Sequence, residues 1–298
     1  MRDNQRRVRN HFLPVFLLKN FAGEDGRLFA YDREKDWNPR PDLPKNLAYE
    51  NNLYAPGTSD DSGRHPKDDA VERWLADQID SPASTPITRL VGGASLSDLS
   101  DDENHAIADF LALLDMRIPA IRDRLVPAFA KGAADAIMDH KRTRKALLKQ
   151  GLRTSLSEVR RIAARQRGEL VASLAKPAWL KWMSDTRHLA RLNVKARRWA
   201  LVHAPPTVEF CTSDRCSVKA LVTMSEPAPW EPGTLLGRAH WLVPLSPALA
   251  LAVMPKDCPY DPEGSAGLVR AVNRQFFRDA VRYVYSRQPV NILDLDAV

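Results

Sequence analysis

Apolar residues at helical spacing dominate the middle of the chain, residues 67–198. Two Ser-x-x-Glu pairs have the form of a helix-capping box, Ser100 with Glu103 and Ser155 with Glu158. The second helix is expected to run to about Ala175, because Pro177 follows it. From residue 68 onward, apolar residues fall at positions i, i+3, i+4 and i+8 of a further helix: Val71, Trp74, Leu75 and Ile79.

Shorter apolar runs separated by turn residues occupy both ends of the chain. Residues 15–21 and 26–31 read as two antiparallel strands joined near Gly26. Residues 266–286 carry apolar positions at helical spacing and predict one C-terminal helix. Between residues 199 and 253, runs rich in β-branched and aromatic residues predict strands over 199–203, 208–212, 218–224 and 241–253.

The pattern as a whole predicts an α+β fold. An antiparallel-rich sheet would be built from N- and C-terminal strands, with a central helical lobe and a C-terminal helix covering the sheet. We expect one domain in which residues 1–66 and 199–298 form the sheet and residues 67–198 are a helical insertion. The alternative is an independent strand-rich domain after Arg198.

Charge is distributed unevenly along a chain of otherwise ordinary composition. The 298 residues are 44% hydrophobic and 27% charged, as in folded globular proteins, with a net charge of +7. Residues 141–198 hold 17 lysines and arginines against three acidic residues, a net of +14, so the rest of the chain has a net charge of −7. Such asymmetry favours a polyanionic partner.

The basic residues form two stripes at helical spacing, suited to contact a phosphate backbone. Trp179 and Trp182 lie nearby in the sequence and could stack on bases. The alternative is a solvated helix face or a contact with an acidic protein. The stripes consist of Lys141, Lys145, Lys149 and Arg153, and of Arg187, Arg191, Lys195 and Arg198.

Several classes of protein are disfavoured by missing signals. No uninterrupted apolar run is long enough to span a membrane, and the three cysteines indicate reduced thiols, so we expect a cytoplasmic protein without a membrane partner. The chain has no Gly-rich phosphate loop, no His-Glu-x-x-His and no kinase signature. Nucleotide-driven chemistry is disfavoured, while the cofactor stays open, a divalent metal included.

His11 and the Thr212-Ser213-Asp214 segment are the candidates for catalysis. A histidine between a basic leader and an apolar run could act as a base near neutral pH. Asp214, with Ser213 and Thr212 at a strand end, could orient His11 or accept a proton. The structural alternatives are a histidine that bonds backbone groups and a turn in which Ser213 and Asp214 bond their own backbone.

Two further polar residues lie within apolar helices and are expected to support the structure. Arg117 would be costly near a core without a partner, and a carboxylate such as Asp80 or Asp115 would make it a structural clamp. Anion binding by Arg117 is the alternative. Asn273, in the C-terminal helix, is expected to bond a strand end.

The opening Asn10-His11-Phe12-Leu13-Pro14-Val15-Phe16-Leu17-Leu18-Lys19-Asn20-Phe21 resembles that of a mainly bacterial family, domain of unknown function 4238. The family form is His-His-x-x-Pro-x-Phe/Tyr-x-Leu-x-x-Phe, and Asn10 replaces the first histidine. The resemblance implies membership without an established activity, and a few members sit among phage-defence genes. It continues in Asn52-Leu53-Tyr54, Arg117-x-Pro119, Phe210-x-Thr212-Ser213-Asp214, Pro244-Leu245-Ser246-Pro247 and Asn273, but Asp80 stands where Glu is common and Arg215-Cys216 replaces Asn-Pro.

Together these observations favour a protein that engages nucleic acid through the helices of residues 141–198. Cleavage of phosphodiesters at a site built from His11 and Asp214 would make it a nuclease-like or phage-defence effector. The alternatives are a non-catalytic protein-interaction module and an enzyme that acts on a small anionic metabolite.

Overall fold

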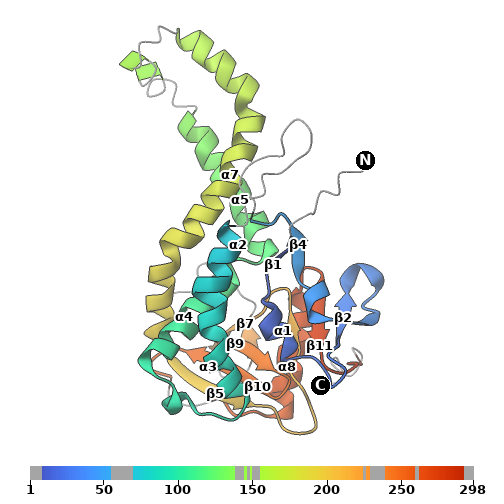
Figure 1. The fold of residues 1–298 in the computed structure, drawn as a ribbon. Coiled ribbons are helices and arrows are strands. Elements are labelled where there is room, and N and C mark those ends of the chain that lie inside the picture. Colours follow the sequence, from blue (N-terminus) through green and yellow to red (C-terminus); the bar gives the residue numbers. More distant parts are fainter. Residues whose placement is uncertain are drawn as a thin grey trace.

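The fold is α+β, as the sequence predicts. The structure, a computed structural model, describes residues 9–54, 70–137, 144–145, 148–149, 155–223, 226–228, 239–258 and 262–291. Within these residues the strands form three antiparallel sheets (Figure 1). The division into a sheet-forming part and a helical insertion stays a prediction.

Strands from both ends of the chain form a four-stranded sheet with the order β3-β2-β11-β6. The C-terminal strand β11 lies between N-terminal β2 and β6, with Val284 opposite Tyr31 on one side and Ser213 on the other. The shared sheet of the predicted fold is therefore confirmed. Its strands are β2 (Leu28–Asp32), β3 (Pro39–Asp42), β6 (Thr212–Ser213) and β11 (Tyr283–Ser286).

A five-stranded sheet has the order β5-β10-β9-β7-β8 and is built from C-terminal strands alone. Every residue of β10 is buried. Alternate side chains of β10 contribute to two separate hydrophobic clusters, one on each face of the sheet. The strands are β5 (Arg198–His203), β7 (Val218–Thr223), β8 (Glu226–Ala228), β9 (Ala239–Ser246) and β10 (Leu249–Met254).

A two-stranded sheet and the helices complete the described fold. β1 (Arg9–His11) pairs with β4 (Tyr49–Asn51). Both predicted capping boxes form, at Ser100 before α4 and Ser155 before α7. The longer helical elements are α1 (Val15–Lys19), α2 (Ala70–Leu75), the π turn η3 (Ala76–Asp80), α3 (Ser81–Val91), α4 (Asp101–Met116), α5 (Pro119–Ile137), α7 (Leu156–Lys195) and α8 (Ala266–Asp279).

The predicted N-terminal strand pair is wrong. The apolar run contains helix α1 after the extended Pro14, which can begin a helix but cannot donate a ladder hydrogen bond. Its buried side chains, Leu17 and Leu18, lie in the larger core with Phe21. β2 pairs with β3 and β11 instead.

The predicted C-terminal helix is too long, because α8 ends at Asp279. Ala280 is extended, with φ −53° and ψ 135°, and β11 follows. Residues 283–285 read Tyr-Val-Tyr, which favours a strand. The predicted strand over residues 208–212 is also wrong for the most part, since only Thr212–Ser213 forms one.

α7 continues past Pro177 to Lys195, so the predicted end near Ala175 is wrong. A proline inside a helix removes one backbone hydrogen bond and crowds the carbonyl of the preceding turn, but packing on the following turns outweighs this cost. Trp179 and Met183 are 0% and 1% exposed.

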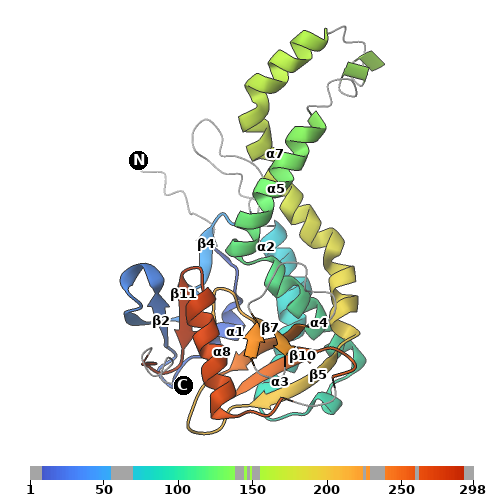
Figure 2. The ribbon, with the colours of Figure 1, turned by 180° about the vertical axis from the view of Figure 1, so that it is seen from behind.

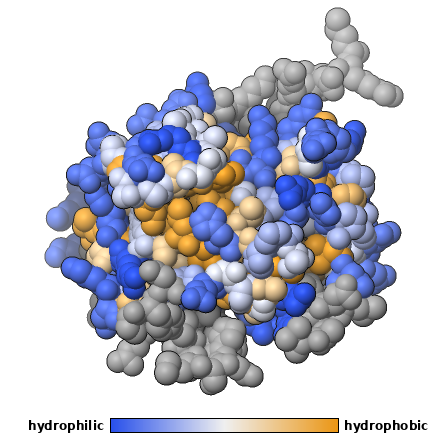
Figure 3. All heavy atoms as spheres, turned by 90° about the horizontal axis from the view of Figure 1, so that it is seen from below, coloured by the Kyte–Doolittle hydropathy of each residue, from blue (hydrophilic) through white to orange (hydrophobic). Residues whose placement is uncertain are grey.

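α5 and the first part of α7 stand away from the sheets as a helical arm (Figures 1 and 2). The remainder of α7 packs beside α4 on the body of the molecule. The face of the body remote from the arm carries apolar surface ringed by hydrophilic residues (Figure 3). None of the described helices is both long enough and apolar enough to cross a membrane.

Candidate functional site

Polar residues from five segments converge beside β1 at the base of the arm. Most belong to positions named by the family resemblance, although they are distant in the sequence. We call this group the motif cluster; it comprises Asn10, His11, Tyr54, Glu72, Asp80 and Arg117.

Backbone and side-chain hydrogen bonds fix the N-terminal strand within the motif cluster. Asn10 is 2% exposed, and its Oδ1 accepts from the backbone N–H of Tyr54 at 3.4 Å. The Tyr54 hydroxyl donates to the carbonyl oxygen of His11 at 3.4 Å and its ring stacks on Trp179. β1 is thus joined to both the Tyr54 segment and α7.

Glu72 is a half-buried carboxyl on α2. It accepts from the backbone N–H of His11 and the side-chain amide of Asn10, both at 3.4 Å. Burial raises the pKa of Glu72 to about 7, although these two donors act in the opposite direction. Glu72 can therefore exchange a proton near neutral pH.

His11 is held in its neutral form. Burial lowers the pKa of its imidazole, against the opposing effect of the Lys45 carbonyl oxygen, which lies 3.3 Å from Nε2. The ring also meets Tyr49 edge to face at 5.8 Å. A neutral imidazole can accept a proton, as general base catalysis requires, but it is the backbone N–H of His11 and not its ring that contacts Glu72.

Arg117 lies in the core, 1% exposed at its side chain, and its Nη1 donates to both oxygens of Asp80 at 2.9 and 3.0 Å. Asp80 is one of the two partners considered from the sequence. Burial alone would lower the pKa of Arg117, but Asp80 and Tyr54 hold it above its usual value, so the guanidinium stays charged. Its Nε and Nη2 have no hydrogen-bond partner in the described chain.

Asp214 lies in a different place and accepts from three consecutive backbone N–H groups. Its oxygens are 3.0, 2.6 and 2.8 Å from the nitrogens of Val281, Arg282 and Tyr283. Within the described residues, no hydrogen bond or ion pair joins His11 to Asp214. Their catalytic pairing stays a prediction, and the contacts of Asp214 favour a structural role.

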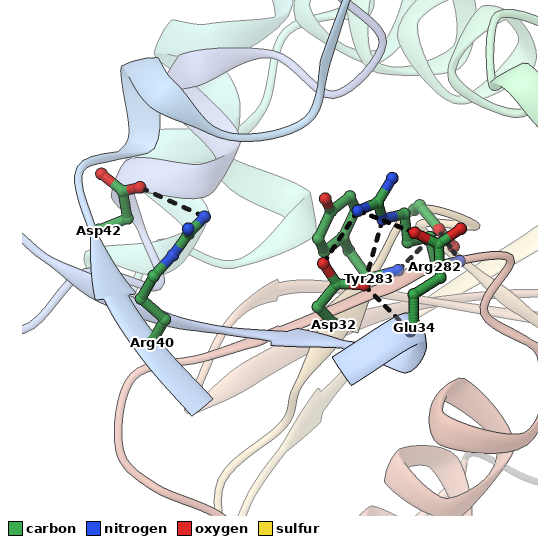
Figure 4. A network of polar contacts seen from close by, with 7 residues as sticks. Asp32, Glu34, Arg40, Asp42, Arg282 and Tyr283 are labelled. Carbon is green, nitrogen blue, oxygen red and sulfur yellow. Dashed lines mark hydrogen bonds and ion pairs between the residues drawn. The ribbon is translucent and has the colours of Figure 1, made fainter. Parts of the chain in front are cut away.

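Arg282, whose backbone N–H donates to Asp214, also contacts the end of β2 in the four-stranded sheet through its side chain (Figure 4). Its guanidinium binds both oxygens of Asp32 at 3.1 Å and reaches Glu34 at 2.9 Å. The hydrogen bond from Arg282 lowers the pKa of Asp32. Asp214 thus holds the backbone of Arg282, while Asp32 and Glu34 hold its side chain.

The neighbours of Asp214 also make local contacts. The Ser213 hydroxyl accepts from the backbone N–H of Arg215 at 3.1 Å, as in a turn. Thr212 pairs with Tyr285 in the sheet, and its buried hydroxyl has no partner in the described chain. Asn273 accepts from the N–H of Cys211 and donates to the carbonyl of residue 209, both at 2.8 Å.

The second basic stripe faces the body of the molecule. Arg187 and Arg191 lie 3.9 and 3.3 Å from Asp109 of α4. Lys195 Nζ is 2.7 Å from a ring nitrogen of His105, and Arg198 donates to the carbonyl of residue 258 at 2.7 Å. These contacts favour a role in packing for the second stripe over contact with a phosphate backbone.

The first stripe is only partly within the described residues. Lys145 and Lys149 are exposed, and Lys141 and Arg153 lie outside the described residues. Trp179 is 0% exposed and its indole N–H donates to the carbonyl of Met116 at 3.3 Å. It cannot stack on a base as the sequence suggested.

Glu72 is the residue that sequence reasoning missed. It follows Val71 in the helical pattern as an ordinary polar position, and no motif marks it. Only the contact of α2 with β1 gives it an unusual environment. In the described parts of the chain, no group of three or more His, Cys, Asp or Glu side chains is placed to hold a metal ion.

Comparison with known protein families gives a match over most of the chain. The family described as "Protein of unknown function (DUF4238)" matches residues 9–289. No curated protein and no solved structure matches the chain.

Proposed function

The chain belongs to the DUF4238 family. Because membership of this family implies no activity, we propose from the charge and shape of the molecule that the protein binds nucleic acid through its helical arm. The observation that carries the proposal is the concentration of positive charge in the sequence after α5 and through the first part of α7. Residues 141–181 hold 12 lysines and arginines against Glu158 and Glu169, a net of +10. The rest of the chain then has a net charge of −3.

The geometry of the arm suits a polyanion. α7 presents its early turns away from the sheets (Figure 2). The exposed cation Arg161 lies in these turns, and the exposed cations Lys145 and Lys149 precede α7 in the sequence. A nucleic acid releases counterions when such residues neutralise its phosphates, and this release drives binding.

The test is fluorescence anisotropy of labelled DNA and RNA over a range of salt concentrations. The triple variant is Lys145→Ala/Lys149→Ala/Arg161→Ala. If all three cations contact phosphates, we expect the slope of log K against log salt concentration to become less negative by about 2–3 units. The matched control removes three exposed cations of the body, Arg27, Lys35 and Lys256, and should leave the slope nearly unchanged.

Two results would contradict the proposal. One is no binding of DNA or RNA even at about 50 mM salt, where electrostatic binding is strong. The other is an equal loss of affinity in the arm variant and in the body control. Binding of an acidic protein instead, with the same dependence on the arm, would identify the interaction module as the function.

A second candidate function is acid–base catalysis at the motif cluster, including cleavage of the bound nucleic acid. It is favoured by Glu72, which accepts from the backbone N–H of His11 and whose pKa is raised to about 7 by burial. Glu72→Gln keeps the size of the side chain but cannot take up a proton. If cleavage occurs, this variant should lose it while binding the same nucleic acid with unchanged affinity.

A further inference from the structure

A cavity of about 640 Å³ lies beside α8, away from the motif cluster. Its walls are the loop of residues 206–211, the C-terminal segment 288–291 and the side chains of Arg270, Asn273 and Ser286. This volume falls within the range of sites that hold small organic ligands.

Buried polar side chains hold both loops of the cavity in place. Asn273 bonds residues 209 and 211, and it is 4% exposed. Ser286, 3% exposed, donates to the carbonyl of Gln288 at 2.6 Å, and the Tyr31 hydroxyl bonds the backbone of Val290. The walls are therefore ordered without a ligand, which lowers the entropic cost of binding.

The charge balance of the cavity favours an anion. Glu209 contributes a carboxylate to its lining, but an ion pair with Arg287 neutralises it. Arg270 has neither an ion pair nor a hydrogen bond within the described residues, and its side chain is only partly exposed. The lining thus presents one guanidinium whose donors are available.

Apolar residues also contribute to the lining of the cavity. Pro206, Val208, Pro289 and Val290 contribute to the lining. Cys211 adds a neutral thiol, since burial raises its pKa to about 12. An anion that fits this lining would combine a charged group with a flat or apolar body.

We propose that this cavity binds a small organic phosphate of nucleotide size, with the phosphate group on the guanidinium of Arg270 and the organic body against the proline and valine walls. Arginine matches a phosphate through two parallel hydrogen bonds. This site is independent of the arm and of the proposed nucleic-acid binding.

Isothermal titration of the full chain with AMP, adenosine and inorganic phosphate tests the proposal. AMP should bind at least about tenfold more tightly than adenosine, because a charge-assisted hydrogen bond contributes that much. It should also bind more tightly than inorganic phosphate, which lacks the organic body. Arg270→Gln should lower the affinity for AMP to that for adenosine.

Arg278→Gln is the matched control, since Arg278 lies on the same helix outside the cavity lining and bonds Gln275 and Asp279. It should leave AMP affinity unchanged. The proposal is overturned if AMP shows no binding up to about 10 mM, if adenosine binds equally well, or if Arg270→Gln has no greater effect than Arg278→Gln. The last result would also follow if AMP simply bound to the basic arm.

Discussion

Asp214 joins β6 to the start of β11 through three backbone hydrogen bonds. Asp214→Ala would leave three N–H groups without their acceptor, so we expect the free energy of unfolding to fall by about 2–4 kcal/mol. Urea denaturation measures this change. The exposed Asp257→Ala is the control and should stay within about 0.5 kcal/mol of the wild type. An Asp214→Ala protein of unchanged stability would return Asp214 to the catalytic candidates.

Glu72 should make stability depend on pH. Its pKa is about 7 in the folded protein against 4.5 as the ordinary value, so between these values the folded state binds more protons and stability falls as pH rises. The loss would be about 2–3 kcal/mol. Urea denaturation of the wild type and Glu72→Gln near pH 5 and pH 8 checks it: the stability of the glutamine variant relative to the wild type should rise by this amount.

A constant difference between Glu72→Gln and the wild type would show that Glu72 ionises normally. Because His11, Asp80 and Arg117 lie nearby, the comparison uses the difference between the two proteins rather than the profile of either. The charges of these neighbours are common to both and largely cancel.

The environment of a side chain could be predicted only where its residue type does not suit the surrounding sequence pattern. Arg117 stands in an apolar helix, and this placement alone calls for a carboxylate, which the structure supplies as Asp80. Glu72 presents no such conflict, because a glutamate is ordinary on a helix face. Its burial arises from tertiary contact with β1, which no local pattern encodes.

Element types were predictable where several local signals agree. The capping boxes at Ser100 and Ser155 mark the starts of α4 and α7 correctly, since the capping hydrogen bonds are local. The ends of α7 and α8 were not predictable in the same way. Pro177 predicted an end of α7, but tertiary packing extends this helix to Lys195. The residues after α8 form strand β11 because β2 and β6 lie on either side of it.

The contact between α4 and α7 gives a prediction for these elements. Asp109 lies between Arg187 and Arg191, and all three side chains are less than a quarter exposed. Asp109→Ala should destabilise the protein by about 1–2 kcal/mol, because it leaves two half-buried cations close together. Thermal unfolding at low and high salt measures the effect, and the loss should shrink at high salt.

Asp185→Ala is the control for this contact, since Asp185 pairs with Lys181 on an exposed face of the same helix. It should change stability by less than about 0.5 kcal/mol. If Asp109→Ala is equally mild, Arg187 and Arg191 are not held by α4, and the second stripe becomes available for a polyanion.

The positive charge of the arm and the cavity beside α8 lie in different parts of the molecule. The arm projects from one end, whereas α8 and the C-terminal strand lie in the body (Figures 1 and 2). The cations of the arm and Arg270 should then act independently, because exposed charges farther apart than about 10 Å are screened at moderate salt. No single residue or element determines this separation, which follows from the way α5 and α7 leave the sheets.

This separation predicts two independent binding events. The Arg270→Gln variant should bind an oligonucleotide that lacks a terminal phosphate with the affinity of the wild type. The arm variant Lys145→Ala/Lys149→Ala/Arg161→Ala should keep its affinity for AMP. Anisotropy and calorimetry on the same preparations measure both affinities, whose effects should add in the combined variant. Displacement of AMP by the oligonucleotide would instead mean that both ligands share one site, since independent sites cannot compete.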